Sequence, residues 1–94
     1  MRLNALAKTQ WEWVESLGWH NKTPLECIAL IASEIGEAAN ECRGEEPTDH
    51  FSEELVGIIL RTVDLAHDQG IDLEAAVKRK MAINLEKGNK GRLK

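Results

Sequence analysis

Three glutamates in the stretch SEIGEAANE, Glu34, Glu37 and Glu41, lie three and four residues apart. If the stretch is helical, 100° per residue places all three on one narrow stripe. That stripe borders an apolar one made by Ile28, Ile31, Ile35, Ala38 and Cys42. Like charges at this spacing repel by roughly a few tenths of a kcal/mol per pair, and by more when partly desolvated. Either the acidic stripe faces open water, as most charged helix edges do, or cations lie against it.

The segment around Glu54 repeats this design. Residues that share a stripe with Glu54 are His50, Gly57, Arg61, Asp64 and Asp68. A mostly apolar stripe beside it comprises Phe51, Leu55, Ile58, Thr62, Leu65 and Ala66. If the two apolar faces pack antiparallel, the two acidic stripes oppose each other across a groove. Oxygen ligands from two helices suit Mg2+ or Mn2+, which favour carboxylates, waters and substrate phosphates.

A third group carries the opposite charge. Lys80, Asn84 and Lys87 are spaced i, i+4 and i+7, with Lys78 and Arg79 beside them. Alone, they are typical of a solvated basic face near a helix C-terminus, where cations also suit the helix dipole. Together with two acidic stripes they become a candidate phosphate clamp, because a metal-bound polyphosphate needs both metal ions and cations.

The elements that must position these residues are four helices joined by short loops. An apolar stripe from Leu3 to Leu17 predicts the first helix, which ends at Gly18. The sequence TPLE from Thr23 is a capping box with proline at the first helical position, and its helix runs to Arg43. Two further helices are predicted, one capped by Thr48 or Asp49 and running to about residue 69, and one from Asp72 to Gly88. Short connections favour antiparallel neighbours, so an all-α bundle is expected.

Composition excludes several classes of protein. The chain has 94 residues, 43% of them apolar, and a net charge of −4, which gives no basic field for binding a nucleic acid polymer. Cys27 and Cys42 lie fifteen residues apart in one predicted helix, about 22 Å at 1.5 Å per residue, so they cannot form a disulfide together. With no signal peptide or membrane-length apolar run, a cytoplasmic protein with reduced thiols and no membrane partner is expected.

The stretches LIASEIGEAANECR and FSEELVGIILRTVDLAHDQGIDLEAAVKRKMAINLEKGNKG resemble the MazG-like nucleoside triphosphate pyrophosphohydrolases, an all-α family with the pattern ExxE, a spacer, then ExxD. The similarity covers about residues 11–91. It implies a four-helix antiparallel bundle that assembles as a homodimer or a homotetramer (a dimer of dimers). The domain would comprise residues 1–88, followed by a flexible polar tail, 89–94. The implied reaction is Mg2+-dependent hydrolysis of a (d)NTP to the (d)NMP and pyrophosphate, and clearing non-canonical nucleotides is one implied role.

Carried over residue by residue, the resemblance assigns metal binding to Glu34 and Glu37 of ExxE and to Glu54 of ExxD. The aspartate of ExxD falls on Gly57, which has no side-chain oxygen. Three explanations compete. In the first, Asp64 is the fourth metal ligand, or else His50 or Glu53 is. In the second, water fills the fourth position. In the third, the protein is a catalytically degenerate member that binds nucleotide or metal, or serves only in interactions.

The remaining roles follow from charge and shape. Glu37 or Glu41 would accept the proton of the attacking water. Cations would stabilise charge on the phosphates, with Lys80 as the catalytic one and Arg61 and Lys87 as further substrate contacts. Asn84 would donate a hydrogen bond to phosphate or sugar. The resemblance of the loop at Gly18-Trp19 to the family's GW segment implies that Trp19 or His20 stacks on the base; the alternative is that Trp19 fills the core or a subunit interface. A ferritin-like di-iron bundle is disfavoured, because no histidine follows a glutamate by three residues.

Overall fold

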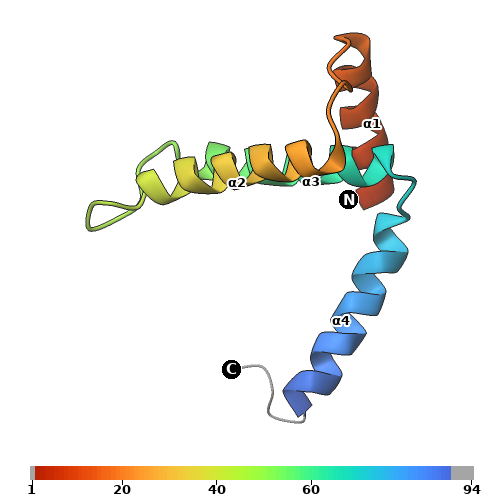
Figure 1. Ribbon diagram of the computed structural model, residues 1–94. Coiled ribbons are helices and arrows are strands. Elements are labelled where there is room, and N and C mark those ends of the chain that lie inside the picture. The colour runs from red at the N-terminus through yellow and green to blue at the C-terminus, as the bar shows by residue number, and fades with distance from the viewer. Residues whose placement is uncertain (1, 90–94) are drawn as a thin grey trace.

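The computed structural model describes residues 2–89, which form four α-helices and no strand (Figure 1). Their bounds are α1, Leu3–Ser16; α2, Pro24–Asn40; α3, Phe51–Asp68; and α4, Leu73–Asn89. This confirms the predicted all-α class and the predicted order of helices. The expected tail lies outside the described residues, apart from Asn89 at the end of α4.

Local sequence signals set most helix ends. At the start of α2 the Thr23 hydroxyl accepts from the Glu26 amide at 3.2 Å, and the Glu26 carboxylate accepts from the Thr23 amide at 2.9 Å, so the capping box is confirmed. These hydrogen bonds from Thr23 also lower the pKa of the Glu26 carboxyl. Gly18 and Gly70, just beyond α1 and α3, both adopt φ of 70°, a conformation that glycine reaches without a Cβ penalty.

Three boundaries differ from the prediction. Helix α2 ends at Asn40, before Arg43, and α4 continues through Gly88 to Asn89. Helix α3 begins at Phe51 with His50 as its N-cap, and no side chain caps it. The expected cap, Thr48, donates its hydroxyl to Glu41 instead. Thr48 therefore ties the α2–α3 loop to the end of α2.

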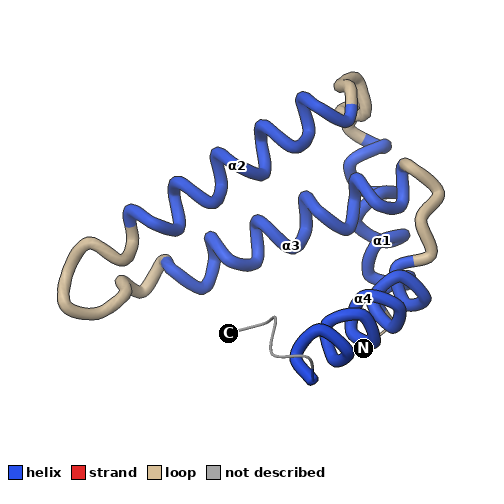
Figure 2. Tube along the Cα trace, turned by 60° about the horizontal axis from the view of Figure 1, so that its bottom comes forward, coloured by secondary structure: helices blue, strands red, loops and turns tan. Residues whose placement is uncertain are grey.

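Helices α2 and α3 form a long antiparallel hairpin, and the other two helices meet it at one end (Figures 1 and 2). Helix α1 packs against α3, while α4 contacts α1 and α3 near its own first residues and makes no contact with α2 within the described part of the chain. In Figure 1, α1 and α4 leave the hairpin in opposite directions. One chain therefore leaves the predicted four-helix bundle open.

The start of α4 is held by Asn4 of α1, a contact that the sequence did not indicate. The Asn4 side-chain oxygen accepts from the amides of Leu73, at 2.8 Å, and Glu74, at 3.3 Å, while its nitrogen donates to Asp72 at 2.9 Å. The predicted cap Asp72 accepts from the Ala75 amide at 3.1 Å. Asn4 thus satisfies backbone donors that the first turn of any helix leaves free.

We expect Asn4→Ala to lower the free energy of unfolding by about 1 kcal/mol, the usual cost of losing a helix cap. The loss should be local, because Asn4 joins α4 to α1. Amide hydrogen exchange should therefore speed up at Leu73 and Glu74 more than in the middle of α3. Asn21→Ala, in the exposed loop after α1, is the matched control and should change neither quantity; equal exchange rates at Leu73 in both variants would contradict the role of Asn4.

The buried core of a single chain is very small. Only four apolar residues among those described are buried: Ala7, Ala38, Val63 and Ala66. The chain exposes 7203 Å², whereas a compact chain of this size is expected to expose about 5,400 Å². Its radius of gyration is 15.6 Å, against about 12 Å for a compact domain of this length. Much apolar surface is thus left without a partner inside one chain.

None of the helices in residues 2–89 combines the length and the apolar character needed to cross a bilayer.

Candidate functional site

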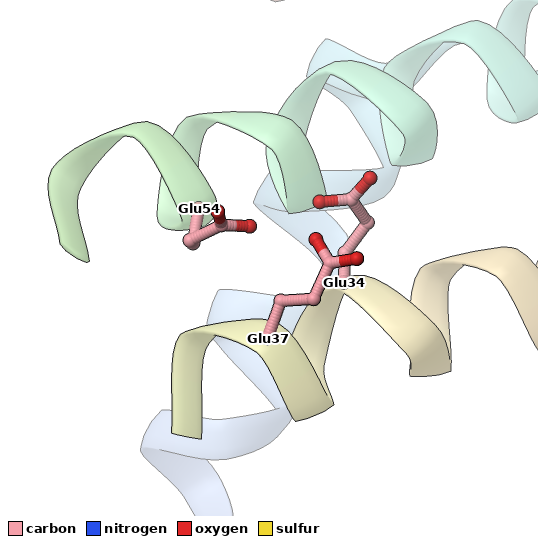
Figure 3. A group of neighbouring side chains, drawn as sticks. All are labelled: Glu34, Glu37 and Glu54. Carbon is pink, nitrogen blue, oxygen red and sulfur yellow. The ribbon is translucent and has the colours of Figure 1, made fainter. Parts of the chain in front are cut away.

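Three of the predicted metal ligands come together in the α2–α3 hairpin. Glu34 and Glu37 project from α2 and Glu54 from α3, into the seam between the two helices (Figure 3). One carboxylate oxygen from each lies within 4.8 Å of the others. Glu34 and Glu54 are half-buried, while Glu37 is exposed. The antiparallel pairing that the two acidic stripes predicted is what places these carboxylates side by side.

Gly57 gives the Glu34 carboxylate the space it occupies. A Cβ built at Gly57 would lie 2.9 Å from Glu34 Oε2 and 3.4 Å from its Cδ. A separation below 3.0 Å is closer than van der Waals contact allows, so any side chain at Gly57 would push Glu34 away. Gly57 stands where a fourth ligand was expected, and its lack of a side chain lets the Glu34 carboxylate lie in the seam between α2 and α3.

The electrostatics of the cluster are those of crowded negative charge. The pKa of Glu54 is raised, first by its hydrogen bond with Glu37, then by partial desolvation and by the charges of Glu37, Glu34 and Glu41. Within residues 2–89 one cation pairs with the cluster: the Arg61 Nε donates to Glu34 at 3.0 Å. Arg61 thus neutralises Glu34 in part, while the negative charges around Glu54 disfavour the ionised form of its carboxyl.

The donor set fits a hard divalent cation. Octahedral Mg2+ holds its oxygens about 2.1 Å away, which places them roughly 3 to 4.2 Å apart. Oxygens already within 4.8 Å of one another reach that spacing by small side-chain rotations. Three carboxylates leave room for waters and phosphate oxygens, which Mg2+ and Mn2+ also accept as ligands.

A cleft of about 500 Å³ opens from the cluster toward α1. Glu34 is the member of the cluster that lines it, together with Gly57 and Arg61, and Trp13 and Trp19 line it as well. The two indoles meet edge to face, with centroids 5.6 Å apart, and remain 54% and 56% exposed. The cleft therefore has both charged and aromatic residues in its lining.

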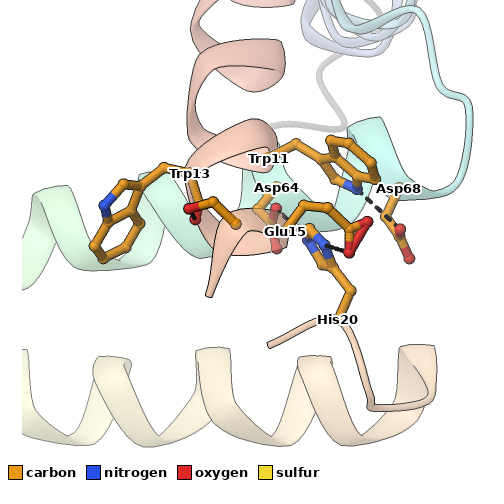
Figure 4. Close-up of polar contacts among 7 residues, drawn as sticks. Trp11, Trp13, Glu15, His20, Asp64 and Asp68 are labelled. Carbon is orange, nitrogen blue, oxygen red and sulfur yellow. Dashed lines mark hydrogen bonds and ion pairs between the residues drawn. The ribbon is translucent and has the colours of Figure 1, made fainter. Parts of the chain in front are cut away.

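His20 also lines the cleft. Its Nε2 lies 2.8 Å from Asp64 Oδ1, and its ring stacks on Trp11 at a centroid distance of 4.9 Å (Figure 4). The enclosed Nδ1 has no hydrogen-bond partner and lies 3.5 Å from Glu15 Oε1, at ion-pair distance. The Trp11 Nε1 donates to Asp68 at 3.0 Å. These contacts fasten the α1–α2 loop to both α1 and α3.

Acidic neighbours raise the pKa of His20. Burial lowers the pKa of His20, but the hydrogen bond and charge of Asp64, joined by Glu15 and Asp68, outweigh burial and raise the pKa above the ordinary 6.5. Because the pKa is higher in the folded state, protonation stabilises the fold fully below pH 6.5. This stabilisation is lost as the pH rises through the folded-state value.

We therefore expect the free energy of unfolding to fall as the pH rises above 6.5. His20→Gln removes the titrating group and should flatten this part of the pH profile, measured by thermal unfolding followed by circular dichroism. His50→Gln changes an exposed histidine at the start of α3 and should leave the profile as in the parent. A pH profile that is unchanged in His20→Gln would show that another group sets it.

Several predicted site residues lie away from the carboxylate cluster. Asp64, expected as a fourth ligand, pairs with His20 instead and is not one of the three clustered carboxylates. Glu41, close enough for its charge to raise the pKa of Glu54, accepts from Thr48. The α4 residues Lys80, Asn84 and Lys87 do not line the cleft.

Other features of this region were missed by the sequence reasoning. Trp11 is half-buried between His20 and His67, and the exposed indoles are Trp13 and Trp19. The role of Asp68 as an anchor for Trp11 also went unpredicted. Both depend on α1 crossing α3, and no spacing within either helix encodes that crossing.

Comparisons with protein-family models, curated proteins and solved structures find no match to this chain.

Proposed function

We propose that this chain is a cytoplasmic Mg2+-dependent nucleoside triphosphate pyrophosphohydrolase of the MazG-like type, which also accepts Mn2+. One observation carries the proposal: a single cleft is lined both by Glu34, a member of the carboxylate cluster, and by two exposed indoles, those of Trp13 and Trp19. A triphosphate requires a metal-binding carboxylate group, and a nucleobase requires an apolar stacking surface. Both lie in one cleft here.

Glu34, Glu37 and Glu54 would hold the metal, which when bound neutralises phosphate charge and makes its water a better nucleophile. The attacking water forms a bond to the α-phosphorus, and the bond between that phosphorus and the bridging oxygen breaks, releasing pyrophosphate. Glu37, the exposed member of the cluster, takes the proton of the water as general base. Arg61, 45% exposed beside Glu34, is placed to turn toward a phosphate oxygen.

The base would lie against Trp19 in the cleft. Trp13 supports Trp19 edge to face, which fixes the orientation of the stacking ring. Lys22 also lines the cleft and adds a cation at its rim. Asp64 and His20 hold the loop that carries Trp19, so their role is to position the base site rather than to bind metal.

A second candidate function is nucleotide or metal binding without catalysis, as a degenerate member of the same type or as an interaction module. Gly57 favours it, because a glycine stands where the resemblance expects a fourth carboxylate. The ion pair from Arg61 to Glu34 points the same way, since it already satisfies one of the three acids.

The proposal is tested by incubating the chain with canonical and modified nucleoside triphosphates in the presence of Mg2+ or Mn2+. Chromatography should show equal amounts of nucleoside monophosphate and pyrophosphate, and chelation of the metal should stop their formation. Release of orthophosphate without pyrophosphate would contradict the reaction. If the folded protein binds a triphosphate by calorimetry but turns none over, the binding function replaces the enzymatic one.

A further inference from the structure

The cleft is lined by two helices that do not touch each other. Trp13 and Val14 line it from α1, and Cys27 and Leu30 line it from α2. Within residues 2–89, α1 and α2 make no contact with each other, and each of them packs against α3. The loop that joins the two helices, residues 17–23, therefore helps to set the width of the cleft.

His20 is the residue of this loop that is fastened to α3. Its side chain is 12% exposed, and its Nε2 lies 2.8 Å from Asp64 Oδ1. Residues 17–22 are all described, and no other side chain among them is hydrogen-bonded to α3. The amide of the preceding residue, Trp19, donates to the Val14 carbonyl of α1 at 3.3 Å. The contact between His20 and Asp64, which lies outside the carboxylate cluster, thus holds the loop and its exposed indole to α3.

The contacts of His20 fit an imidazolium cation better than either neutral tautomer. Among the residues of 2–89 that are not exposed, His20 Nδ1 is the one buried side-chain nitrogen or oxygen without a hydrogen-bond partner, and it faces Glu15 Oε1 at 3.5 Å (Figure 4). A neutral imidazole has one N–H group and one lone pair. Whichever nitrogen carries the single proton, the other turns its lone pair toward the carboxylate of Asp64 or of Glu15. The cation presents an N–H group to both carboxylates.

The surroundings of the imidazole favour the cation as well. The ring stacks on Trp11 with the ring planes 19° apart and the centroids 4.9 Å apart, and an indole face attracts a cation at this distance. Burial lowers the pKa of His20, but Asp64, Glu15 and Asp68 raise it above 6.5. The remaining titratable groups around the cleft are Lys22 of the loop, Cys27 and Glu34 of α2, Arg61 of α3 and, against Trp11, His67 of α3.

We infer that His20 is a positioning residue whose protonated side chain, held between Glu15 and Asp64, latches the α1–α2 loop in the arrangement that binds a nucleotide in the cleft. Loss of the proton turns one of the two contacts repulsive and removes a positive charge beside a negatively charged ligand. Both effects weaken nucleotide binding. By reciprocity, nucleotide binding takes up a proton from solvent at His20 where the free protein has lost it. The inference rests on the proposed function for the identity of the ligand, whereas the latch itself rests on the contacts of His20.

The proton uptake is measured by calorimetry on the full chain with Mg2+. The probes are the α,β-methylene analogues of ATP, GTP, CTP and UTP, whose α–β linkage is not hydrolysed. Above the pKa of His20 the affinity of the parent should fall by up to about 10-fold per pH unit, the limit for one linked proton. Titrations in buffers of different ionisation enthalpy should show the proton taken up.

His20→Gln provides the comparison, because glutamine can donate a hydrogen bond to Asp64 but does not titrate. The analogues titrate in the same way with either protein, so the difference between the two pH profiles belongs to His20. The variant should bind more weakly than the parent at low pH and should lose the proton uptake. Identical pH profiles in parent and variant would overturn the inference.

Asp64→Asn and Glu15→Gln separate the latch from a merely structural contact. Each variant keeps the size of the side chain and an oxygen that accepts a hydrogen bond, but it loses the charge that favours the cation. The pH at which affinity falls should therefore move lower in both, and further in Asp64→Asn, whose carboxylate lies closer to the ring. Glu12→Gln, exposed on α1, is the matched control and should leave this pH unchanged. If Asp64→Asn weakens binding by the same factor at every pH, the contact is only structural and the inference is wrong.

The latch is also tested in the chain alone, without metal or nucleotide. Nitrogen NMR of the imidazole follows the protonation of His20, whose signals are assigned with His20→Gln, and the indole N–H of Trp19, assigned with Trp19→Phe, reports on the loop. The Trp19 signal should shift as His20 titrates and should stay constant over the same pH range in His20→Gln. A Trp19 signal that does not respond to this titration would contradict the latch.

The outcomes separate this inference from the proposed function. Proton-linked nucleotide binding without turnover would remove the proposed reaction and leave the latch standing. Turnover with a pH profile that His20→Gln does not change would remove the latch and leave the reaction standing. A chain that binds none of the analogues at any pH would overturn both.

Discussion

Glu37→Gln is expected to lower the rate of pyrophosphate release by at least about 100-fold, the usual range for losing a general base. The variant keeps the size of the side chain and its hydrogen-bonding capacity but loses the charge and the ability to accept a proton from water. Glu37 is exposed, so the substitution removes no packing. Turnover at saturating Mg2+ is the measurement, and unchanged helical circular dichroism shows that the fold is retained.

The stability of Glu37→Gln distinguishes the loss of a general base from the loss of the fold. Glu37 raises the pKa of Glu54 through a hydrogen bond and through its charge, so removing the charge should let that pKa fall toward its ordinary value. The metal-free protein should then be at least as stable as the parent near neutral pH, because a repulsion has been removed. Glu12→Gln on α1 makes the same chemical change away from the cluster and should leave turnover unchanged. Full turnover in Glu37→Gln would exclude this residue from the mechanism.

The sequence predicted the helices well because their signals are local. The Thr23 capping box, the glycines at 18 and 70 and the Asp72 cap each act within one turn, and each is confirmed. Gly88 was wrongly predicted to end α4, because that prediction relied on a local signal alone. A glycine costs about 1 kcal/mol inside a helix, which the rest of α4 can tolerate, so its presence does not force the helix to stop.

The packing of the apolar stripes was harder to predict, because the periodicity of an amphipathic helix does not indicate whether its apolar side packs within its own chain or against a second copy. The stripe containing Ile28 and Ile35 was expected to form the core, yet both residues are more than half exposed. The seam instead uses the small Ala38 beside Glu34, which brings the carboxylates between the helices. A stripe that packs against a second copy and one that packs within the chain have the same periodicity.

The site was predicted in part. Periodicity placed Glu34, Glu37 and Glu54 on facing stripes, and these are the three carboxylates that converge. It also placed Asp64 on the α3 stripe, but Asp64 lies nearly three turns beyond Glu54, where it meets His20 of the α1–α2 loop. Contacts between distant segments, such as this one and that of Trp11 with Asp68, depend on the crossing of α1 over α3.

Gly57 distinguishes a working site from a degenerate one, because the two possibilities predict opposite effects of adding a side chain there. If the glycine marks a lost ligand, Gly57→Asp restores a fourth carboxylate and should strengthen metal binding. If the glycine makes space for Glu34, any side chain displaces that carboxylate, since a Cβ would lie 2.9 Å from Glu34 Oε2. The geometry favours the second outcome.

We therefore expect Gly57→Ala to weaken Mg2+ binding by about 10-fold or more, a loss typical of disturbing the support of a metal ligand. Stability should not fall with it, because alanine gains about 0.5 to 1 kcal/mol over glycine in a helix interior and Glu34 is free to swing toward solvent. Calorimetric titration with Mg2+ and thermal unfolding measure the two effects separately. Gly36→Ala, in the neighbouring helix with nothing within 4 Å of its added Cβ, is the matched control and should gain stability without losing metal.

Gly57→Asp should fare no better than Gly57→Ala, because its Cβ meets Glu34 before its carboxylate can reach the cation. Tighter Mg2+ binding or faster turnover in Gly57→Asp would show that the natural chain lacks a ligand, which would support the degenerate, binding-only function. Weaker binding in both variants, with stability retained, means that the glycine belongs to the site. In that case three carboxylates suffice for the metal. Gly57 is required because the Glu34 carboxylate fits into the seam only where α3 has no side chain.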